Sequence, residues 1–403
     1  KRNSKAYIKA CATSKYWITN YSLPKYAVPS KEQVYIQTWH GKPLKRIGCD
    51  FKGDQLGRRT HHQIKKDYTR NGKRLSILLS PAPIFSEKMS SAYNLDKLGK
   101  KTIIKETGYP RNDFLFTYTP QDVLRIKMNL GIPLNKKVVL YAPTWRSKTY
   151  ISLFEYVYHS AVDLKKLHMQ LGNQYVILFR AHDHEAKSID FSHLKDAVID
   201  VTHVNDVNEL YIVSDLMISD YSGTIFDYAN LKRPMVLYMY DREDYEKSPG
   251  FYFDPDTFPA KIVYKEEDLA PAIIETLENF VYDENYKQFN ETYNKLDGPD
   301  CSINTLDKII DLKSSQTKSK SKVLKYKKFI RFMQIKTGAF FREKGFLLSA
   351  NSRMLKSFKN KHKGQRCFLI GNGPSLTITD LNKLKNEICF GCNMIYKIFD
   401  RTE

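Results

Sequence analysis

The sequence predicts an α/β protein built on parallel sheets, and three observations support this. Short apolar runs alternate with helix-length amphipathic segments through most of the first 310 residues, as in βαβ units. Each apolar run ends in a turn rich in Ser, Pro, Gly, His or Asp. The length of 403 residues corresponds to two or three domains rather than one. Because ligands bind at the carboxyl ends of such strands, we expect the functional residues in these turns.

The predicted strands follow one another at regular intervals. They cover residues 34–36, 76–79, 138–141, 175–179, 197–201, 216–218 and 235–238. A helix is predicted over 121–132, and amphipathic stretches between 266 and 295 suit closing helices. We therefore expect an N-terminal domain at 1–120, too short to be complete, and a C-terminal domain at 121–312.

The positive charge is concentrated in one segment. The whole chain carries +21, but residues 313–366 hold seventeen Lys or Arg and a single acidic residue, Glu343. Apolar side chains are interleaved with this charge, so two interpretations of the connector at 313–365 are open. It is either a solvated linker followed by a helix that packs on its own protein, or a basic amphipathic helix that lies on anionic lipid. No binding module accompanies the charge, and we expect no nucleic acid partner.

The ends of the chain and its cysteines limit the remaining classes. The first residue is Lys1 and not Met, so we expect the chain to begin within a longer protein. No apolar stretch is long enough for a membrane span, and the six scattered cysteines suggest free thiols in a reducing compartment, with no zinc site. Residues 366–403 read as a strand and a GNGPSL turn, the start of another nucleotide-binding sheet.

The first motif, TWHGKPLK at residues 38–45, directly follows a predicted strand. Gly41 lets backbone approach a ligand, Pro43 stiffens the turn, and His40 can exchange a proton near neutral pH. A lone histidine at a strand end is more often structural. The basic side chains from Lys42 onward favour a phosphate-handling site.

The second motif is ETGYPRND at residues 106–113. Gly108 and Pro110 alone would serve an interdomain turn. Arg111 adds a planar cation suited to a diphosphate, and the two roles can coexist.

The third and fourth motifs also follow apolar strands. In YAPTWR at 141–146, Thr144 offers a hydroxyl and Trp145 either a stacking surface or a packed core side chain. In FRAHDH at 179–184, Arg180 and His182 project to the same side if the chain stays extended. A metal site in this second motif is a weak alternative, because adjacent side chains diverge.

The fifth motif, SDLMISDYSGTIFDYA at residues 214–229, is a strand, a hydroxyl-rich turn and a helix start. The helix N-terminus could face an anion, and Asp227 could accept hydrogen bonds from ribose or a polyol. The alternative is that Ser222 and Thr224 only cap the helix.

In this order and at these spacings, the five motifs resemble those of the CDP-glycerol glycerophosphotransferase family, the teichoic acid polymerases and primases of Gram-positive cell walls. The matching stretches are TWHGKPLK, ETGYPRND, YAPTWR, FRAH and SDLMISDYSGTIFDYA, followed by Arg233-Pro234 and Gly250-Phe251-Tyr252. The resemblance covers about residues 10–300. It implies two Rossmann-like domains facing a cleft, of the glycosyltransferase GT-B type. Residues 366–403 lie outside the resemblance and look like the start of a further Rossmann-like module.

The resemblance also implies an activity and its residues. Glycerol phosphate, or a related polyol phosphate, would pass from CDP-glycerol to a hydroxyl of a membrane-anchored acceptor, releasing CMP and building teichoic acid or a similar capsule polymer. His40 would act as general base, and His182 would stabilise or protonate the departing CMP. The positions implied to bind substrate are Gly41, Lys42, Pro43, Leu44, Arg111, Thr144, Trp145, Arg180, Ala181, Ser222, Gly223 and Asp227.

Two positions depart from the family pattern. Lys42 stands where the family usually has Thr, and Gly223 where a second Ser is frequent, so CDP-ribitol or another CDP-linked polyol stays open as donor. The other implied partners are a lipid-linked or polymer acceptor and the anionic cytoplasmic face of a bacterial plasma membrane, with a homo-oligomer left open. We expect no required cofactor or metal. The alternative function is an inactive transferase-fold scaffold that binds anionic membrane or polymer through its basic connector.

Overall fold

The computed structural model describes residues 4–56, 59–144, 161–181, 197–315, 364, 367–370 and 388–391. The chain divides into two compact units that alternate along the sequence. The first comprises residues 1–38, 74–78 and 303–403, and the second comprises 39–73 and 79–302. The predicted boundaries near residues 120, 312 and 365 are not those of these units, and they stay proposals.

The first unit contains parallel strands, as predicted. Helix α1 (Lys5–Thr13) leads into β1 (Tyr16–Thr19), which pairs in parallel with β2 (Val34–Gln37). On its other side β2 pairs with the first half of β5 (Ile77–Ser80). Strand β1 was not predicted, because its apolar run is short and mixed with polar residues.

The C-terminal part of the first unit is described only in pieces. Helix α12 (Cys301–Ser315) enters it, and β13 (Cys367–Ile370) pairs in parallel with β14 (Ile388–Gly391). The strand predicted at the start of the C-terminal fragment is therefore present. The GNGPSL turn and nearly all of the basic connector lie outside the described residues.

The second unit is organised around a sheet in which six described strands run parallel in the order β12-β11-β10-β7-β8-β9. These strands are β7 (Lys137–Tyr141), β8 (Tyr175–Phe179), β9 (Val198–Asp200), β10 (Leu216–Ser219), β11 (Met235–Tyr238) and β12 (Lys261–Val263). All except β12 were predicted. The parallel pairing confirms the α/β class.

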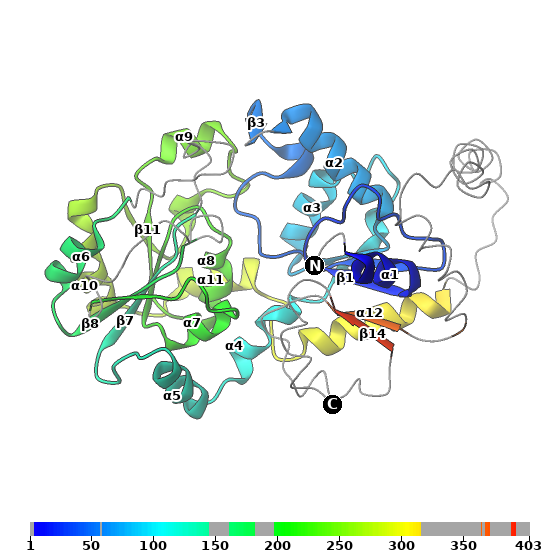
Figure 1. The fold of residues 1–403 in the computed structure, drawn as a ribbon. Coiled ribbons are helices and arrows are strands. Elements are labelled where there is room, and N and C mark those ends of the chain that lie inside the picture. The colour runs from blue at the N-terminus through cyan, green and yellow to red at the C-terminus, as the bar shows by residue number, and fades with distance from the viewer. Residues whose placement is uncertain are drawn as a thin grey trace. The chain divides into compact units, whose positions relative to one another are not determined.

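Helices cover both faces of this sheet (Figure 1). One face packs against α5 (Pro120–Asn129), α7 (Val207–Val213), α8 (Thr224–Tyr228) and α11 (Glu284–Tyr293). The other packs against α6 (Leu164–Leu171) and α10 (Leu269–Asn279). Successive residues of each strand point to opposite faces of the sheet, and each face packs against a hydrophobic core. Residues on both faces must therefore be apolar, which explains the continuous apolar runs in the sequence.

The remaining strands and α-helices of the second unit come from residues 55–117 and 242–247. They are β3 (Gln55–Leu56), β4 (Arg59–Thr60), α2 (His61–Arg74), α3 (Pro83–Ala92), β6 (Ile104–Glu106), α4 (Phe114–Thr117) and α9 (Arg242–Lys247). An aromatic cluster joins α3 to α8 and α11: the ring of Phe226 stacks on Phe289 and meets Phe85 edge-on. No helix within the described ranges is both long and apolar enough to cross a membrane.

Candidate active site

The loop that carries His40, residues 39–46 and called the His40 loop below, has an unusual backbone. Trp39 has φ +61° and Gly41 has φ +153°, two backbone conformations that residues with a β-carbon rarely adopt. The Trp39 ring is buried and packs edge-on against Tyr93, with ring centroids 5.9 Å apart. The His40 side chain is exposed, and its ring centroid lies 4.3 Å from that of Trp39. The loop thus presents the predicted general base to solvent.

The second motif holds this loop through Arg111. The Arg111 guanidinium donates from Nη1 to the carbonyl oxygen of His40 at 2.7 Å, and its Nη2 pairs with the Asp227 carboxylate. The phenolic hydroxyl of Tyr109 donates to the carbonyl oxygen of Gly41 at 3.4 Å. The second motif therefore holds the carbonyl groups of His40 and Gly41, and Arg111 links this backbone to Asp227 of the fifth motif.

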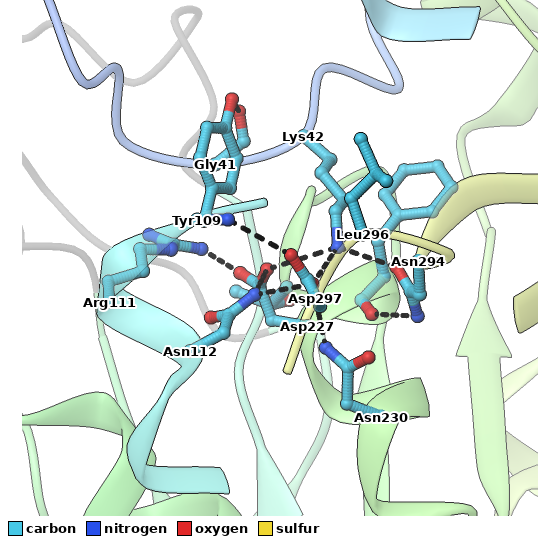
Figure 2. Close-up of polar contacts among 12 residues, drawn as sticks. Gly41, Lys42, Tyr109, Arg111, Asn112, Asp227, Asn230, Asn294, Leu296 and Asp297 are labelled. Carbon is cyan, nitrogen blue, oxygen red and sulfur yellow. Dashed lines mark hydrogen bonds and ion pairs between the residues drawn. The ribbon is translucent and has the colours of Figure 1, made fainter. Parts of the chain in front are cut away.

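Lys42 points into the protein. Its side chain is fully buried; its Nζ donates to Oδ1 of Asn294 at 2.5 Å, forms an ion pair with Asp297 and lies 3.9 Å from Oδ1 of Asp227 (Figure 2). Burial lowers the pKa of Lys42, because removal from water disfavours the charged ammonium. The Asp227 side chain is also fully buried. The substrate-binding roles of Lys42 and Asp227 stay predictions, and both charged groups have protein partners.

The third and fifth motifs are joined through Thr144. Its backbone N–H lies 3.0 Å from each carboxylate oxygen of Asp220, and its hydroxyl donates to the same carboxylate. The Ser219 hydroxyl donates to the carbonyl oxygen of Ala142 at 3.0 Å. The Thr144 hydroxyl thus lies at the ends of β7 and β10. Trp145 lies outside the described residues.

The fourth motif continues the same edge of the sheet. The backbone N–H of Arg180 donates to the Tyr141 carbonyl at 2.9 Å, and its guanidinium donates to the Val204 carbonyl at 2.9 Å. The Ala181 N–H donates to the Thr202 hydroxyl at 3.0 Å. His182, the predicted acid, lies outside the described residues.

The start of α8 shows how the fifth motif is built. The hydroxyl of Ser222 accepts the backbone N–H of Thr224 at 3.3 Å, whereas the N-cap residue of α8 is Gly223, so neither Ser222 nor Thr224 occupies the N-cap position. Gly223 has no side chain, and the backbone of Lys42 occupies the space where a β-carbon would lie. Anion binding at this turn and a donor contact from either position stay predictions.

The GFY stretch after α9 is hydrogen-bonded to the backbone at the end of the His40 loop. The Arg46 N–H donates to the Gly250 carbonyl at 2.9 Å, and the Tyr252 N–H donates to the Leu44 carbonyl at 2.8 Å. The Leu44 side chain is buried in the core, and Pro43 beside it is buried as well. These two predicted site positions therefore anchor the loop within the protein.

Sequence reasoning did not single out several polar residues that bond to the predicted site positions or to one another. They are Asn112, Asp220, Asn230, Asn294 and Asp297. Asp297 precedes Gly298 and Pro299, and such a stretch looks like an ordinary turn. No local signal marks it, because its partners come from remote parts of the chain. Among the described residues, no group of three or more His, Cys, Asp or Glu could hold a metal ion.

Comparison with solved structures defines the class. The chain matches a structure of the wall teichoic acid polymerase TagF with a TM-score of 0.70 and 34% identity, over 78% of this chain and 77% of that chain. The protein thus has a GT-B-like α/β transferase fold, as predicted. Residues 1–311 match the family model described as CDP-Glycerol:Poly(glycerophosphate) glycerophosphotransferase, and the chain belongs to this family.

Two curated relatives carry names consistent with the family. A teichoic acid poly(glycerol phosphate) polymerase from Bacillus spizizenii is 35% identical over 77% of this chain and 78% of its own length. A protein of the same name from Staphylococcus epidermidis is 39% identical over 63% of this chain and 35% of its own length. The chain thus spans most of the first relative and about a third of the second.

Proposed function

We propose that this chain transfers glycerol phosphate from CDP-glycerol to a hydroxyl of a membrane-anchored acceptor, releasing CMP and extending teichoic acid or a related polymer. Membership of the glycerophosphotransferase family supports this, as do the relatives named as poly(glycerol phosphate) polymerases. These findings do not favour the alternative of an inactive scaffold. The structural observation that carries the proposal is an exposed His40 on a loop that is hydrogen-bonded by the second motif and by the GFY stretch.

The reaction needs a base, and His40 is the candidate. The acceptor hydroxyl oxygen forms a bond to the phosphorus that carries glycerol, while the bond from that phosphorus to the oxygen shared with CMP breaks. The proton of the hydroxyl passes to the His40 imidazole, and CMP leaves with the electron pair of the broken bond. His182 would stabilise or protonate CMP, a role that rests on the family resemblance.

The direct test measures CMP release from CDP-glycerol in the presence of a lipid-linked glycerophosphate acceptor. We expect His40→Ala to lower kcat by about a hundredfold to ten-thousandfold, the usual contribution of a general base. His168→Gln is the matched control, because this histidine lies on α6, which packs on the opposite face of the sheet from α7 and α8. Equal rates for wild type and His40→Ala would contradict the proposal.

The donor and the location are finer parts of the proposal. The relatives' names favour glycerol over ribitol, and substituting CDP-ribitol for CDP-glycerol in the same assay tests this choice. A location at the cytoplasmic face of the plasma membrane, through the basic connector at 313–365, remains the expected one. Co-sedimentation with vesicles containing anionic lipid, compared with neutral vesicles, tests it.

A further inference from the structure

Four charged side chains gather at the Lys42 end of the His40 loop, and three of them are fully buried. They are two cations, Lys42 and Arg111, and two carboxylates, Asp227 and Asp297 (Figure 2). The side chains of Lys42, Asp227 and Asp297 have no exposed surface, and that of Arg111 is 30% exposed. Equal numbers of the two signs offset the cost of removing these charges from water.

Asp297 is the centre of this group. Its Oδ1 accepts the backbone N–H of Tyr109 at 3.1 Å. Its Oδ2 pairs with Lys42 and accepts the side-chain amides of Asn112 at 2.8 Å and Asn230 at 3.0 Å. One carboxylate therefore connects the His40 loop, the second motif and the segment after α8.

The backbone on the N-terminal side of Lys42 needs support. Trp39 is a bulky residue with positive φ, a conformation that costs about 1–2 kcal/mol and persists only where the surroundings enforce it. The buried Trp39 ring anchors one side of His40, and the buried Lys42 ammonium anchors the other. The exposed His40 side chain is thus held between two buried anchors.

We propose that Lys42 and Asp297 are positioning residues, which fix the loop so that His40 faces the acceptor hydroxyl, and that the Lys42 ammonium does not contact the donor diphosphate. This inference rests on the proposed function. A well-paired buried ion network fixes geometry more than it adds stability. A small displacement of a reacting group can lower the rate about a hundredfold.

The test separates positioning from donor binding. Lys42→Met keeps the length of the side chain and removes its charge, and Asp297→Asn keeps the shape of the carboxylate. In each variant we expect kcat for CMP release to fall at least about tenfold, with KM and the calorimetric Kd for CDP-glycerol within about threefold of wild type. The double variant should lose little beyond either single one, because both act through one contact.

The matched controls use an ion pair far from the loop in sequence and exposed on the surface. Lys261 and Glu275 lie 3.1 Å apart and are each about half exposed, so Lys261→Met and Glu275→Gln should leave kcat unchanged. A further variant serves if Lys42→Met or Asp297→Asn does not fold. Asn230→Ala removes a single hydrogen-bond donor to Asp297, and it should also lower kcat, but by less.

Three results would overturn the inference. One is a Kd for CDP-glycerol that rises tenfold or more in Lys42→Met, which would make Lys42 a donor ligand. Another is an unchanged kcat in a folded Lys42→Met or Asp297→Asn variant. The third applies if neither of these two variants folds, and it is an unchanged kcat in Asn230→Ala. Absence of CMP release from wild type would instead refute the proposed function, which the same assay distinguishes.

Discussion

Gly223 lies directly against the carbonyl oxygen of Lys42, so that a β-carbon at Gly223 would overlap this oxygen. The start of α8 and the His40 loop therefore approach each other more closely than any larger residue allows. Both positions depart from the pattern that the family resemblance implies, and the structure shows that the two departures touch. The backbone of Gly223 is not in the left-handed region, so its conformation does not require glycine. The close approach of the Lys42 carbonyl does.

This contact predicts that Gly223→Ala displaces the His40 loop. We expect a loss of roughly 1–3 kcal/mol in the free energy of unfolding, as for other overpacked sites, together with a fall in kcat. Gly298→Ala is the control, because a β-carbon there meets open space. Thermal unfolding and CMP release measure the two effects. A fully stable and active Gly223→Ala variant would show that the loop does not lie where the structure has it.

A second prediction concerns the half-buried carboxyl of Asp206, which caps α7 by accepting the Asn208 N–H at 2.9 Å. Burial raises the pKa of Asp206 above its ordinary value of 3.8, although Arg111 and Arg180 partly oppose the shift. A raised folded-state pKa means that the unfolded chain ionises first, so stability falls as pH rises from 3.8 through the folded-state pKa.

Asp206→Asn should therefore stabilise the protein at neutral pH, because asparagine also caps helices and carries no charge. The gain should shrink as pH falls toward the ordinary pKa of the carboxyl. Chemical denaturation of wild type and variant across this range measures it. Asp163→Asn, at the exposed cap of α6, is the control and should give no comparable gain at neutral pH. A gain that grows on acidification would have the wrong sign.

A third prediction concerns the thiol of Cys301, which is buried beside the segment that carries Asp297. Its Sγ donates to the carbonyl of Leu296 at 3.3 Å, and burial raises the pKa of this thiol to about 12. Near pH 8 only roughly one thiol in ten thousand would then be ionised. Iodoacetamide should label half-buried Cys49 before Cys301 in the folded protein, and both equally after unfolding. Peptide mass spectrometry distinguishes them, and rapid native labelling of Cys301 would mean that this segment is not docked.

A fourth prediction concerns the aromatic cluster beneath α8. Phe289 on α11 is 3% exposed and stacks on Phe226 with an interplanar angle of 6°. Phe289→Ala should lower the free energy of unfolding by about 3–5 kcal/mol, through lost burial and the cavity left behind. Met169→Ala on α6 should cost less than about 0.5 kcal/mol, because Met169 is 73% exposed. Denaturant titration of both variants checks the contrast, and equal losses would contradict the packing.

Most of the sheet could be predicted from local pattern. Strands β7, β8, β10 and β11 are buried on both faces, so their apolar runs stand out and were placed correctly. Strand β12 was missed because only three residues form it and one is exposed. The motifs were recognisable because each follows a strand, where parallel strands gather their carboxyl ends.

The sequence by itself determined the α/β class, the family and the position of His40 at a strand end, because periodicity and motif order are local properties of the chain. Only the tertiary structure decided that the ammonium of Lys42 faces inward. Its partner Asn294 lies 252 residues away in the chain, and Asp297 lies 255. No periodicity links residues at that separation. Packing of the loop against α8 and the segment after α11 brings them together, and burial makes each depend on the opposite charge of the other.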